Sequence, residues 1–385
     1  MQTNTAARQT TQHRNIGRHD GAVQPRPKNG QTQNRHSPPA LQDQPLAPKR
    51  WRYVLNLILQ EHNWRHSSKH KGVSHKTMAE RSRFCIWLFT FLRQPPLMFK
   101  LDPRSFSGRH ADAITAHWRE QAKKGLMSPA TIQTYFSFLK TFTVWIGKPK
   151  LLRPIECYFG DARLFQRSLA SGVDKSWRAQ GVDVDAVIRM VEERDVHAAA
   201  SMKLMQAFHL RFKESVMLRP HEDVITAAQA GRGDEAGQPH AAAELFLDTH
   251  RGTKGGRERL VPINTPQRVA AIDFARRVTV GVHESVSDPR LNLQQAMRHL
   301  RYVMECHGIA RGELGVTPHG LRHQGAADVY ESITGQLPSV AGGAPVEPEL
   351  DRQARQQIAE HLGHGRRQIV CAYFGKSVQH ERTAR

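Results

Sequence analysis

The stretch SPATIQTYFSFLKTFTVWIGKP, residues 128–149, carries the clearest structural pattern in the chain. Ser128 can cap the N-terminus of a helix, and Pro129 suits its first turn. Apolar residues then recur every three or four positions until Gly147 and Pro149 end the pattern. This spacing predicts an amphipathic helix that presents one apolar face to a core, made of Ile132, Tyr135, Phe136, Leu139, Phe142, Trp145 and Ile146.

The sequence before this helix has the same character. Similar periodicity runs through residues 54–62, 77–93 and 111–125. Aromatic side chains on such stripes belong to a core far more often than they bind a cofactor. We therefore expect residues 51–148 to form a small helical domain with a basic exterior.

Residues 1–50 differ sharply from the rest of the chain. They contain no Phe, Trp or Tyr, and they carry eight Lys and Arg residues against two acidic ones. Such a segment has too little apolar surface to offset the entropy lost on ordering. It is expected to be a disordered basic tail, either inert or adding weak phosphate contacts.

The sequence after residue 148 predicts a second unit. We expect a linker at 149–173 and a domain at 174–385 that is mainly helical. ELFLDTH (244–250) and RLVPI (259–263) have the patterns of strands, and the glycines between them favour a hairpin. The expected fold class is mainly α with a small β-sheet (α+β), with helices near 184–195, 198–210, 291–307 and 321–333, a Pro/Gly-rich loop at 335–349, and a last amphipathic stretch from Leu350.

Composition restricts the class of partner. The 385 residues include 56 Lys and Arg against 35 Asp and Glu, so the net charge is +21 and the pI is near 10.4. This surplus favours a nucleic acid over an anionic membrane surface, because neutralising phosphates releases condensed counterions. The four cysteines form no C-x-x-C pair, and no apolar run is long enough for a signal peptide or a transmembrane helix. These features predict a cytoplasmic protein.

Four stretches of the second unit place chemically useful residues in order along the chain. They are FHLRFKESVML, RGTKGGRERLVPI, TPHGLRHQ and HLGHGRRQIVCAYF. Each stretch alone is ordinary, and a lone tyrosine near a helix end usually serves packing. Together they supply two arginines, a lysine, two histidines and a tyrosine: Arg211, Lys254, His319, Arg322, His364 and Tyr373.

This set suits attack on a phosphodiester. Guanidiniums stay charged and offer paired donors to the phosphate oxygens, on which negative charge develops in the transition state. A tyrosine hydroxyl is a poor nucleophile in water but can be activated beside arginines and a histidine. A lysine on a hairpin can protonate the departing sugar oxygen. We find no carboxylate cluster that would hold a metal.

From about residue 51 to 375 the sequence resembles the tyrosine recombinases, the phage-integrase family. The LGHGR signature before the tyrosine is similar to that of integrases from proteobacterial mobile and integrative elements. Arg211 with Glu214 matches the first arginine of the family and its acid, and Lys254 matches the hairpin lysine. His319 and Arg322 match the H-x-x-R pair of the family. His364 matches the histidine of the LGH motif, and Tyr373, nine positions later, matches the nucleophile.

The resemblance implies a site-specific DNA recombinase that works through a 3′-phosphotyrosyl intermediate without metal, ATP or another cofactor. It also implies a core-binding, SAM-like DNA-binding domain at 51–148 and a catalytic domain at 174–385. The implied partners are double-stranded DNA attachment sites and three further copies of the chain, forming a homotetramer on DNA with a monomer as the candidate free state. An accessory directionality factor is a further candidate, the expected location is the bacterial cytoplasm, and no membrane is implied.

Departures and alternatives remain open. His209 stands where related sequences often have glycine, and long segments at 228–241 and 335–349 separate the motifs. A type IB topoisomerase would share the chemistry, and a DNA-binding protein without turnover would share the constellation. A metal site is the other alternative, since His319 and His323 have an i, i+4 spacing and His361 and His364 an i, i+3 spacing. In HGLRH, however, glycine stands where an H-E-x-x-H zinc site has its glutamate.

Overall fold

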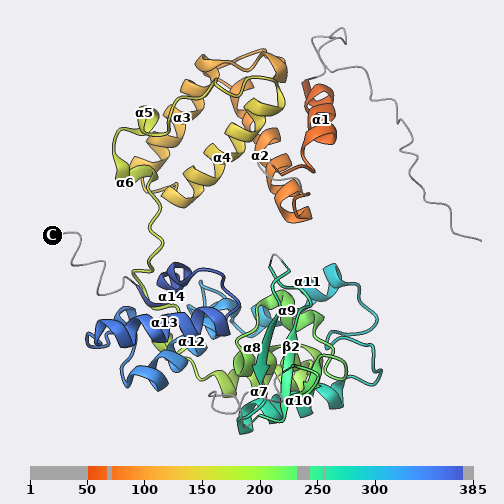
Figure 1. The fold of residues 1–385 in the computed structure, drawn as a ribbon. Helices are drawn as coiled ribbons and strands as arrows, with labels where there is room; N and C mark the ends of the chain where they lie inside the picture. Colours follow the sequence, from red (N-terminus) through yellow and green to blue (C-terminus); the bar gives the residue numbers. More distant parts are fainter. Residues whose placement is uncertain (1–50, 67–71, 232–242, 255, 376–385) are drawn as a thin grey trace, which may run out of the picture. The chain divides into compact units, whose positions relative to one another are not determined.

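The computed structural model describes residues 51–66, 72–231, 243–254 and 256–375. The chain divides into two compact units, Met1–Gln166 and Arg167–Arg385 (Figure 1). The disordered tail expected at 1–50 lies outside the described residues. Within the described part of the chain, no helix combines the length and the apolar character needed to cross a membrane.

The first unit is helical, as its apolar periodicity predicts. Ser128 caps the helix over Pro129–Trp145 by accepting from the backbone N–H of Thr131, and Gly147 leaves the helical path with a φ of 72°. The described elements are α1 (Trp51–His62), α2 (His75–Arg93), the 3₁₀ turn η2 (Pro103–Ser105), α3 (Gly108–Lys123), α4 (Pro129–Trp145), α5 (Glu156–Phe159) and α6 (Ala162–Phe165).

Aromatic residues fill the core of the first unit. Trp118, Phe89, Phe106 and Phe142 are fully buried, and Phe89 and Phe142 meet edge to face with ring centroids 5.3 Å apart. Edge-to-face pairs of this kind stabilise a core beyond their buried area. All seven residues of the predicted stripe on α4 pack into or against this core, which fixes the arrangement of the helices within the unit.

The segment expected as a linker, 149–173, begins with structured residues. The short helices α5 and α6 pack on α3 and α4, and they bury Tyr158, Phe159 and Phe165 in the aromatic core. The contact boundary of the first unit consequently falls after Gln166 rather than near residue 148. These aromatic residues are too widely spaced to form a helical stripe, so periodicity alone did not assign them to the core.

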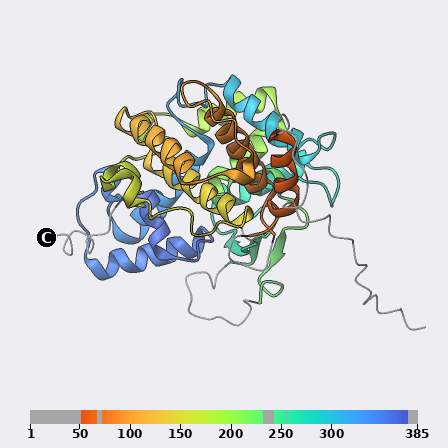
Figure 2. The same ribbon diagram turned by 90° about the horizontal axis from the view of Figure 1, so that it is seen from above.

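The second unit is built mainly of helices around α8. Figures 1 and 2 show α12, α13 and α14 grouped on one side of this unit, in blue. Its described elements are η3 (Arg178–Gln180), α7 (Val184–Arg194), α8 (Val196–Phe208), α9 (Phe212–Met217), β1 (Val224–Thr226), β2 (Leu245–Thr249), β3 (Arg259–Pro262), α10 (Pro266–Val278), α11 (Leu293–Cys306), α12 (Pro318–Thr334), η4 (Ser339–Ala341), α13 (Pro348–His361), η5 (Arg367–Val370) and α14 (Cys371–Phe374).

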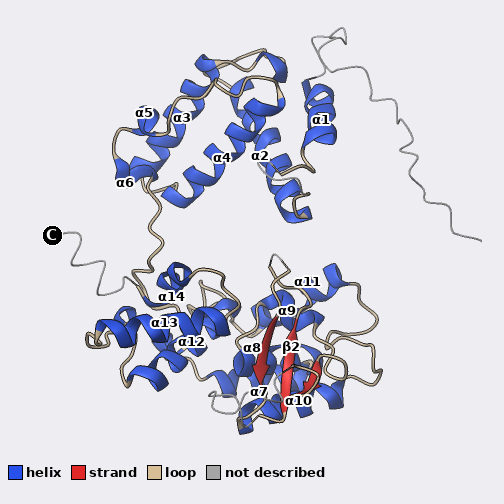
Figure 3. Ribbon diagram, in the orientation of Figure 1, coloured by secondary structure: helices blue, strands red, loops and turns tan. Residues whose placement is uncertain are grey.

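The three strands form one antiparallel sheet in the order β1-β2-β3, red in Figure 3. Leu247 on the central strand pairs with Val224 on one side and with Val261 on the other. Leu247 and Val261 are fully buried in the core that surrounds α8, which holds the sheet against the helices. The predicted hairpin and the mainly helical fold class are confirmed. The edge strand β1 was not predicted, because three residues carry too little periodicity.

The second unit contains two apolar clusters. The larger surrounds α7, α8, α10 and α11, and the smaller joins α12, α13 and α14. Tyr373 and Phe374 belong to the smaller cluster. The C-terminus of α8 packs near α12, so the polar side chains discussed below gather where elements of both clusters meet.

Candidate active site

Tyr373 lies in α14 with its side chain almost entirely inside the protein, at 7% exposure. Its hydroxyl oxygen lies 3.2 Å from Nε of Arg322 and 3.2 Å from Nε2 of His364. The Nε–H of Arg322 donates to this oxygen, and the direction of the bond with His364 depends on the imidazole tautomer. The tyrosine therefore has a guanidinium and an imidazole within hydrogen-bond reach.

Arg322 is fully buried on α12 and is held by two backbone carbonyls. Its Nη1 donates to the carbonyl of His209, and its Nη2 donates to the carbonyl of Leu362. His209 is the C-cap of α8 and Leu362 is the C-cap of α13. Carbonyls at helix C-termini carry partial negative charge, so both helices stabilise the buried cation.

Arg211 forms the N-cap of α9 and reaches the same carbonyl. Its Nη2 lies 3.3 Å from the Leu362 oxygen, and its Nη1 lies 2.5 Å from Oε1 of Glu214. The buried Glu214 carboxylate also pairs with Arg259 at 3.1 Å. Burial alone would raise the pKa of Glu214, but the charges of Arg259 and Arg211, together with hydrogen bonds from Arg211, hold it below its usual value. Glu214 therefore serves as a charged anchor for two arginines.

Two histidines of α12 stand close to the tyrosine ring. The ring centroid of His323 lies 4.6 Å from that of Tyr373, and the centroid of His319 lies 6.1 Å away. His323 is buried, whereas His319 is exposed at its position near the start of the helix. The i, i+4 spacing thus packs one imidazole on the tyrosine and leaves the other accessible.

The imidazole of His364 is uncharged near neutral pH. Burial, followed by the positive charges of Arg322 and Arg211, lowers the pKa of His364 to about 4. Part of the His319 surface is exposed, but the protein atoms packed around it and the same two guanidiniums also lower its pKa to about 4. A neutral imidazole beside the tyrosine hydroxyl can accept a proton from it.

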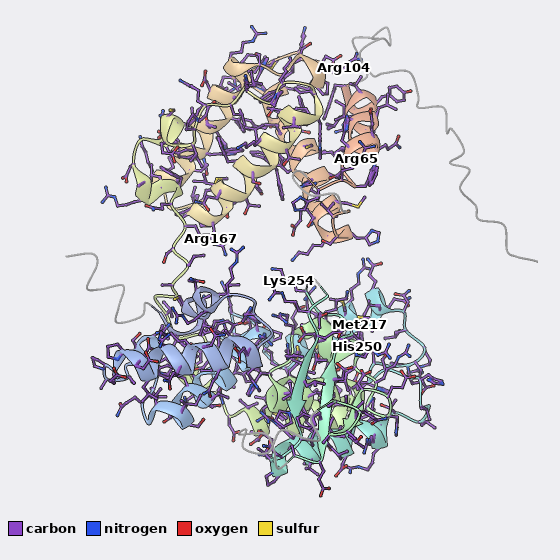
Figure 4. All side chains as sticks on the ribbon, in the orientation of Figure 1. Arg65, Arg104, Arg167, Met217, His250 and Lys254 are labelled. Atoms are coloured by element: carbon purple, nitrogen blue, oxygen red, sulfur yellow. The ribbon has the colours of Figure 1, made fainter. Side chains whose placement is uncertain are left out.

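Lys254 lies apart from this group, at an exposed turn between β2 and β3. In Figure 4 it is at the end of the hairpin, with Met217 and His250 nearer the base. The base is anchored by Arg251, whose Nε lies 2.9 Å from Asp223 and whose Nη2 lies 2.8 Å from Glu222. In the described part of the chain, the hydrogen bonds and ring contacts of Tyr373 do not include Lys254. The hairpin thus has a fixed base and an exposed end.

The structure also places residues at this site that motif reasoning did not select. Arg259 joins Glu214 and lies 3.5 Å from the Leu362 carbonyl oxygen. The side chains of His209 and His361 lie behind Arg322 and make contact with each other. Arg259 is hidden among the charged residues of the hairpin, and both histidines were visible only as neighbours of the motifs. No local pattern separates them from surface residues.

Among the described residues, the structure offers no set of ligands for the zinc site that the histidine spacing raised. No group of three or more His, Cys, Asp or Glu side chains there has a geometry that could hold a metal ion. His319 and His323 face each other edge-on, with ring centroids 5.2 Å apart.

Residues 170–328 match the model of a protein family described as Integrase. This match is in keeping with the resemblance to the tyrosine recombinases that the motifs carry. The matched segment contains Arg211, Lys254, His319 and Arg322, and it ends before His364 and Tyr373. The narrower resemblance to integrases of proteobacterial mobile elements stays a prediction.

Several solved structures are similar to this chain. A XerA recombinase is 15% identical, with a TM-score of 0.32, covering 86% of this chain and 97% of the other. A lambda integrase tetramer bound to a Holliday junction is 13% identical, with a TM-score of 0.48 and coverage of 86% and 79%. A lambda integrase(75–356) dimer bound to a COC′ core site is 14% identical, with a TM-score of 0.48 and coverage of 81% and 92%. No match was found among proteins of curated function.

Proposed function

We propose that this protein is a site-specific DNA recombinase that cleaves and rejoins duplex DNA through a covalent bond to Tyr373. The match of residues 170–328 to the Integrase family supports this function. The observation that carries the proposal is the position of the Tyr373 hydroxyl, 3.2 Å from both Arg322 and His364. The net charge of +21 favours DNA as the partner, because phosphate contacts dominate such binding.

The proposed first step forms one bond and breaks one. The Tyr373 oxygen attacks the scissile phosphorus, and the bond from phosphorus to the 5′ oxygen breaks, leaving a 3′-phosphotyrosyl linkage. Neutral His364 takes the phenolic proton, a role supported by its 3.2 Å contact. Its lowered pKa keeps the imidazole uncharged, so its ring nitrogen is free to accept. Lys254 supplies a proton to the departing 5′ oxygen, which becomes a free hydroxyl.

The arginines act on the charge of the phosphate. Arg211 is partly exposed, so its guanidinium can meet a phosphate oxygen from solvent. Arg322 uses one N–H of each terminal nitrogen on a carbonyl, so each terminal nitrogen keeps a second N–H that these two bonds do not use. Donors that are held in place before the substrate arrives stabilise developing charge without reorganisation. His319 adds a polar contact at the accessible side of the tyrosine.

The second step is the reverse of the first with a different strand. A 5′-hydroxyl from the partner duplex attacks the phosphotyrosine, the bond from phosphorus to tyrosine breaks, and the proton returns to Tyr373. The phosphodiester energy is conserved in the covalent intermediate, so the proposal needs no ATP. Two duplex attachment sites and an assembly of four copies of the chain belong to the same proposal.

A nicked suicide substrate tests the nucleophile. It should trap the wild-type protein on DNA in denaturing gels, and Tyr373→Phe should abolish the trapped band while binding DNA normally. Tyr302→Phe is the matched control, because Tyr302 is an exposed tyrosine on α11. The Tyr302→Phe protein should be trapped like wild type. An undiminished band from Tyr373→Phe would remove Tyr373 from this role.

Exchange between two duplexes tests the reaction class. The ends of the genetic element that encodes the protein are the natural substrates for this assay. Joined products with new flanking sequence support a recombinase. Relaxation of supercoiled DNA without any strand exchange would assign the chain to topoisomerase chemistry instead.

A further inference from the structure

Two buried histidines outside the proposed catalytic set make a direct contact behind Arg322. Nδ1 of His209 lies 2.8 Å from Nε2 of His361, and the ring centroids are 5.0 Å apart at an interplanar angle of 65°. One ring must donate and the other accept, so at least one of them is neutral. The contact joins the end of α8 to the end of α13, although the residues are 152 positions apart in the chain.

Histidine is an unusual residue for the backbone conformation found at position 209. Its φ of 52° and ψ of 39° lie in the left-handed region, where a helix C-terminus usually carries glycine. An L side chain is strained there unless other contacts retain it. The ring contact with His361 is one such contact.

A space on α12 accommodates the His209 ring. A Cβ added to Gly325 would lie 1.9 Å from Cδ2 and 2.1 Å from Nε2 of His209. Gly325 follows Arg322 by three positions, so both lie on the same face of the helix. The imidazole thus occupies the volume that a side chain at position 325 would need.

The two histidines also mark the backbone groups that hold Arg322. The carbonyl of His209 accepts from Nη1 of Arg322, and the carbonyl of Leu362, the residue after His361, accepts from Nη2. Arg322 then directs its Nε toward Tyr373 at 3.2 Å. A shift of either helix end would move the guanidinium relative to the tyrosine hydroxyl.

We propose that His209 and His361 are positioning residues for Arg322. Their ring hydrogen bond ties together the two helix ends whose carbonyls orient the guanidinium. The catalytic consequence rests on the proposed function, in which Arg322 stabilises the attack of Tyr373 on phosphate.

The charges around the pair agree with this role. Arg268 of α10, Arg259 of β3 and Arg322 of α12 all face it. Burial and then these guanidiniums lower the pKa of His209 to about 3, and burial, together with neighbouring His209 and the same arginines, holds the pKa of His361 well below its usual value. The pair therefore supplies a hydrogen bond without adding positive charge beside three arginines.

The first test separates positioning from folding. His209→Gly keeps a backbone that tolerates the left-handed conformation and removes only the ring. Trapping of a suicide substrate should slow by about 10²-fold, the effect expected when a reacting group is misplaced by about 1 Å. DNA affinity should stay near the wild-type value, and the protein should keep a cooperative unfolding transition at a lower temperature, because a buried ring and its hydrogen bond are lost. His307→Ala is the control, because Nδ1 of His307 bonds to a carbonyl of its own helix, 2.8 Å away at Val303.

A conservative variant sharpens the result. His209→Asn tolerates the same backbone region and carries an amide near the position of Nδ1. It should recover much of the lost trapping rate, whereas a purely space-filling role predicts no recovery relative to His209→Gly. The positioning role would be overturned if His209→Gly is trapped at the wild-type rate. It would also be overturned if the trapping rate of His209→Asn is no higher than that of His209→Gly.

The second test addresses the packing and needs no catalysis. Gly325→Ala should lower the unfolding temperature by several degrees, because its methyl group meets the His209 ring. The loss should disappear in the double variant with His209→Gly. Gly312→Ala is the control, since a Cβ there meets nothing within 4 Å. If Gly325→Ala lowers the unfolding temperature no more than Gly312→Ala does, the packing of the His209 ring against Gly325 is overturned. That result would stand even if trapping of the wild-type protein supports a recombinase. Absence of any trapped wild-type protein would instead overturn the proposed function.

Discussion

The group around Tyr373 and the hairpin that carries Lys254 are organised in opposite ways. Arg322 is fully buried and each of its nitrogens donates to a protein oxygen. Lys254 is exposed at a turn, and Arg251 fixes the base of its hairpin. One part of the proposed machinery is assembled by the fold, and the other projects from it.

This difference shows which part of the site loses its conformational entropy during folding and which part loses it when DNA binds. The Tyr373 group is ordered during folding, so little conformational entropy is lost there when DNA binds. An exposed lysine on a glycine-rich turn must be ordered by the substrate itself. Changes in the Tyr373 group should therefore alter both stability and catalysis, and changes at Lys254 should alter catalysis alone.

After Tyr373→Phe, which should abolish trapping, the largest expected effect comes from Arg322→Ala. Cleavage should fall by about 10³-fold or more, because a charge that stabilises the transition state is lost. The protein should also lose about 1–3 kcal/mol of stability, since buried carbonyls lose their donor. Suicide-substrate trapping and urea unfolding measure the two effects.

Arg211→Ala provides the comparison for Arg322. It should slow cleavage to a similar extent but destabilise the protein less, because the Arg211 side chain is 22% exposed and water can replace its contacts. The exposed Arg311→Ala is the control for both. A normal cleavage rate in either variant would make that arginine structural.

Lys254→Ala should slow cleavage by about 10²-fold, the usual contribution of a general acid. Its unfolding temperature should not change, because the side chain is exposed. A bridging 5′-phosphorothioate provides a thiolate leaving group that needs no proton, so this substrate should restore cleavage. Tyr373→Phe should stay inactive on both substrates. An equal defect of Lys254→Ala on both would exclude it as the general acid.

Acid should destabilise the Tyr373 group through its buried histidines. The pKa of His209 is about 3 in the folded protein, against about 6.5 unfolded, so the unfolded state binds the extra proton as the pH falls below 6.5. The stability contributed by the neutral form is present above that pH and declines below it. For His209 alone the loss between pH 7 and pH 5 is about 2 kcal/mol.

Urea unfolding at the two pH values measures this loss. His209→Gly should show a smaller difference between pH 7 and pH 5 than wild type. Lys254→Ala should keep the wild-type difference, since the hairpin end takes no part in it. An unchanged difference in His209→Gly would mean that this histidine is not buried as an uncharged group.

The smallest effect is expected from Ser339→Ala in the Pro/Gly-rich loop. Oγ of Ser339 donates to the carbonyl of Phe374 at 2.9 Å and so helps to hold the segment that carries Tyr373. Loss of one such bond costs about 1 kcal/mol. Trapping should slow a few-fold. Ser332→Ala is the control, because that hydroxyl bonds within its own helix to Val329. Equal behaviour of the two variants would show that the loop does not position the tyrosine.

Much of the fold followed from the sequence because local patterns carry it. The stripe on α4, the cap at Ser128 and the glycine-rich turn near Lys254 each specify an element from neighbouring residues alone. The boundary after Gln166 did not follow, since scattered aromatics such as Tyr158 and Phe165 join the core only through tertiary packing.

By itself the sequence predicted the fold class, the resemblance to a family and the six candidate site residues, whose catalytic roles stay predictions. It could do so because motif spacing and charge are properties of the chain. Only the tertiary structure decided that Glu214 anchors two arginines, that two helix ends hold Arg322, and that His209 meets His361. These contacts join segments up to 152 positions apart, and their strength depends on burial, which no local pattern records.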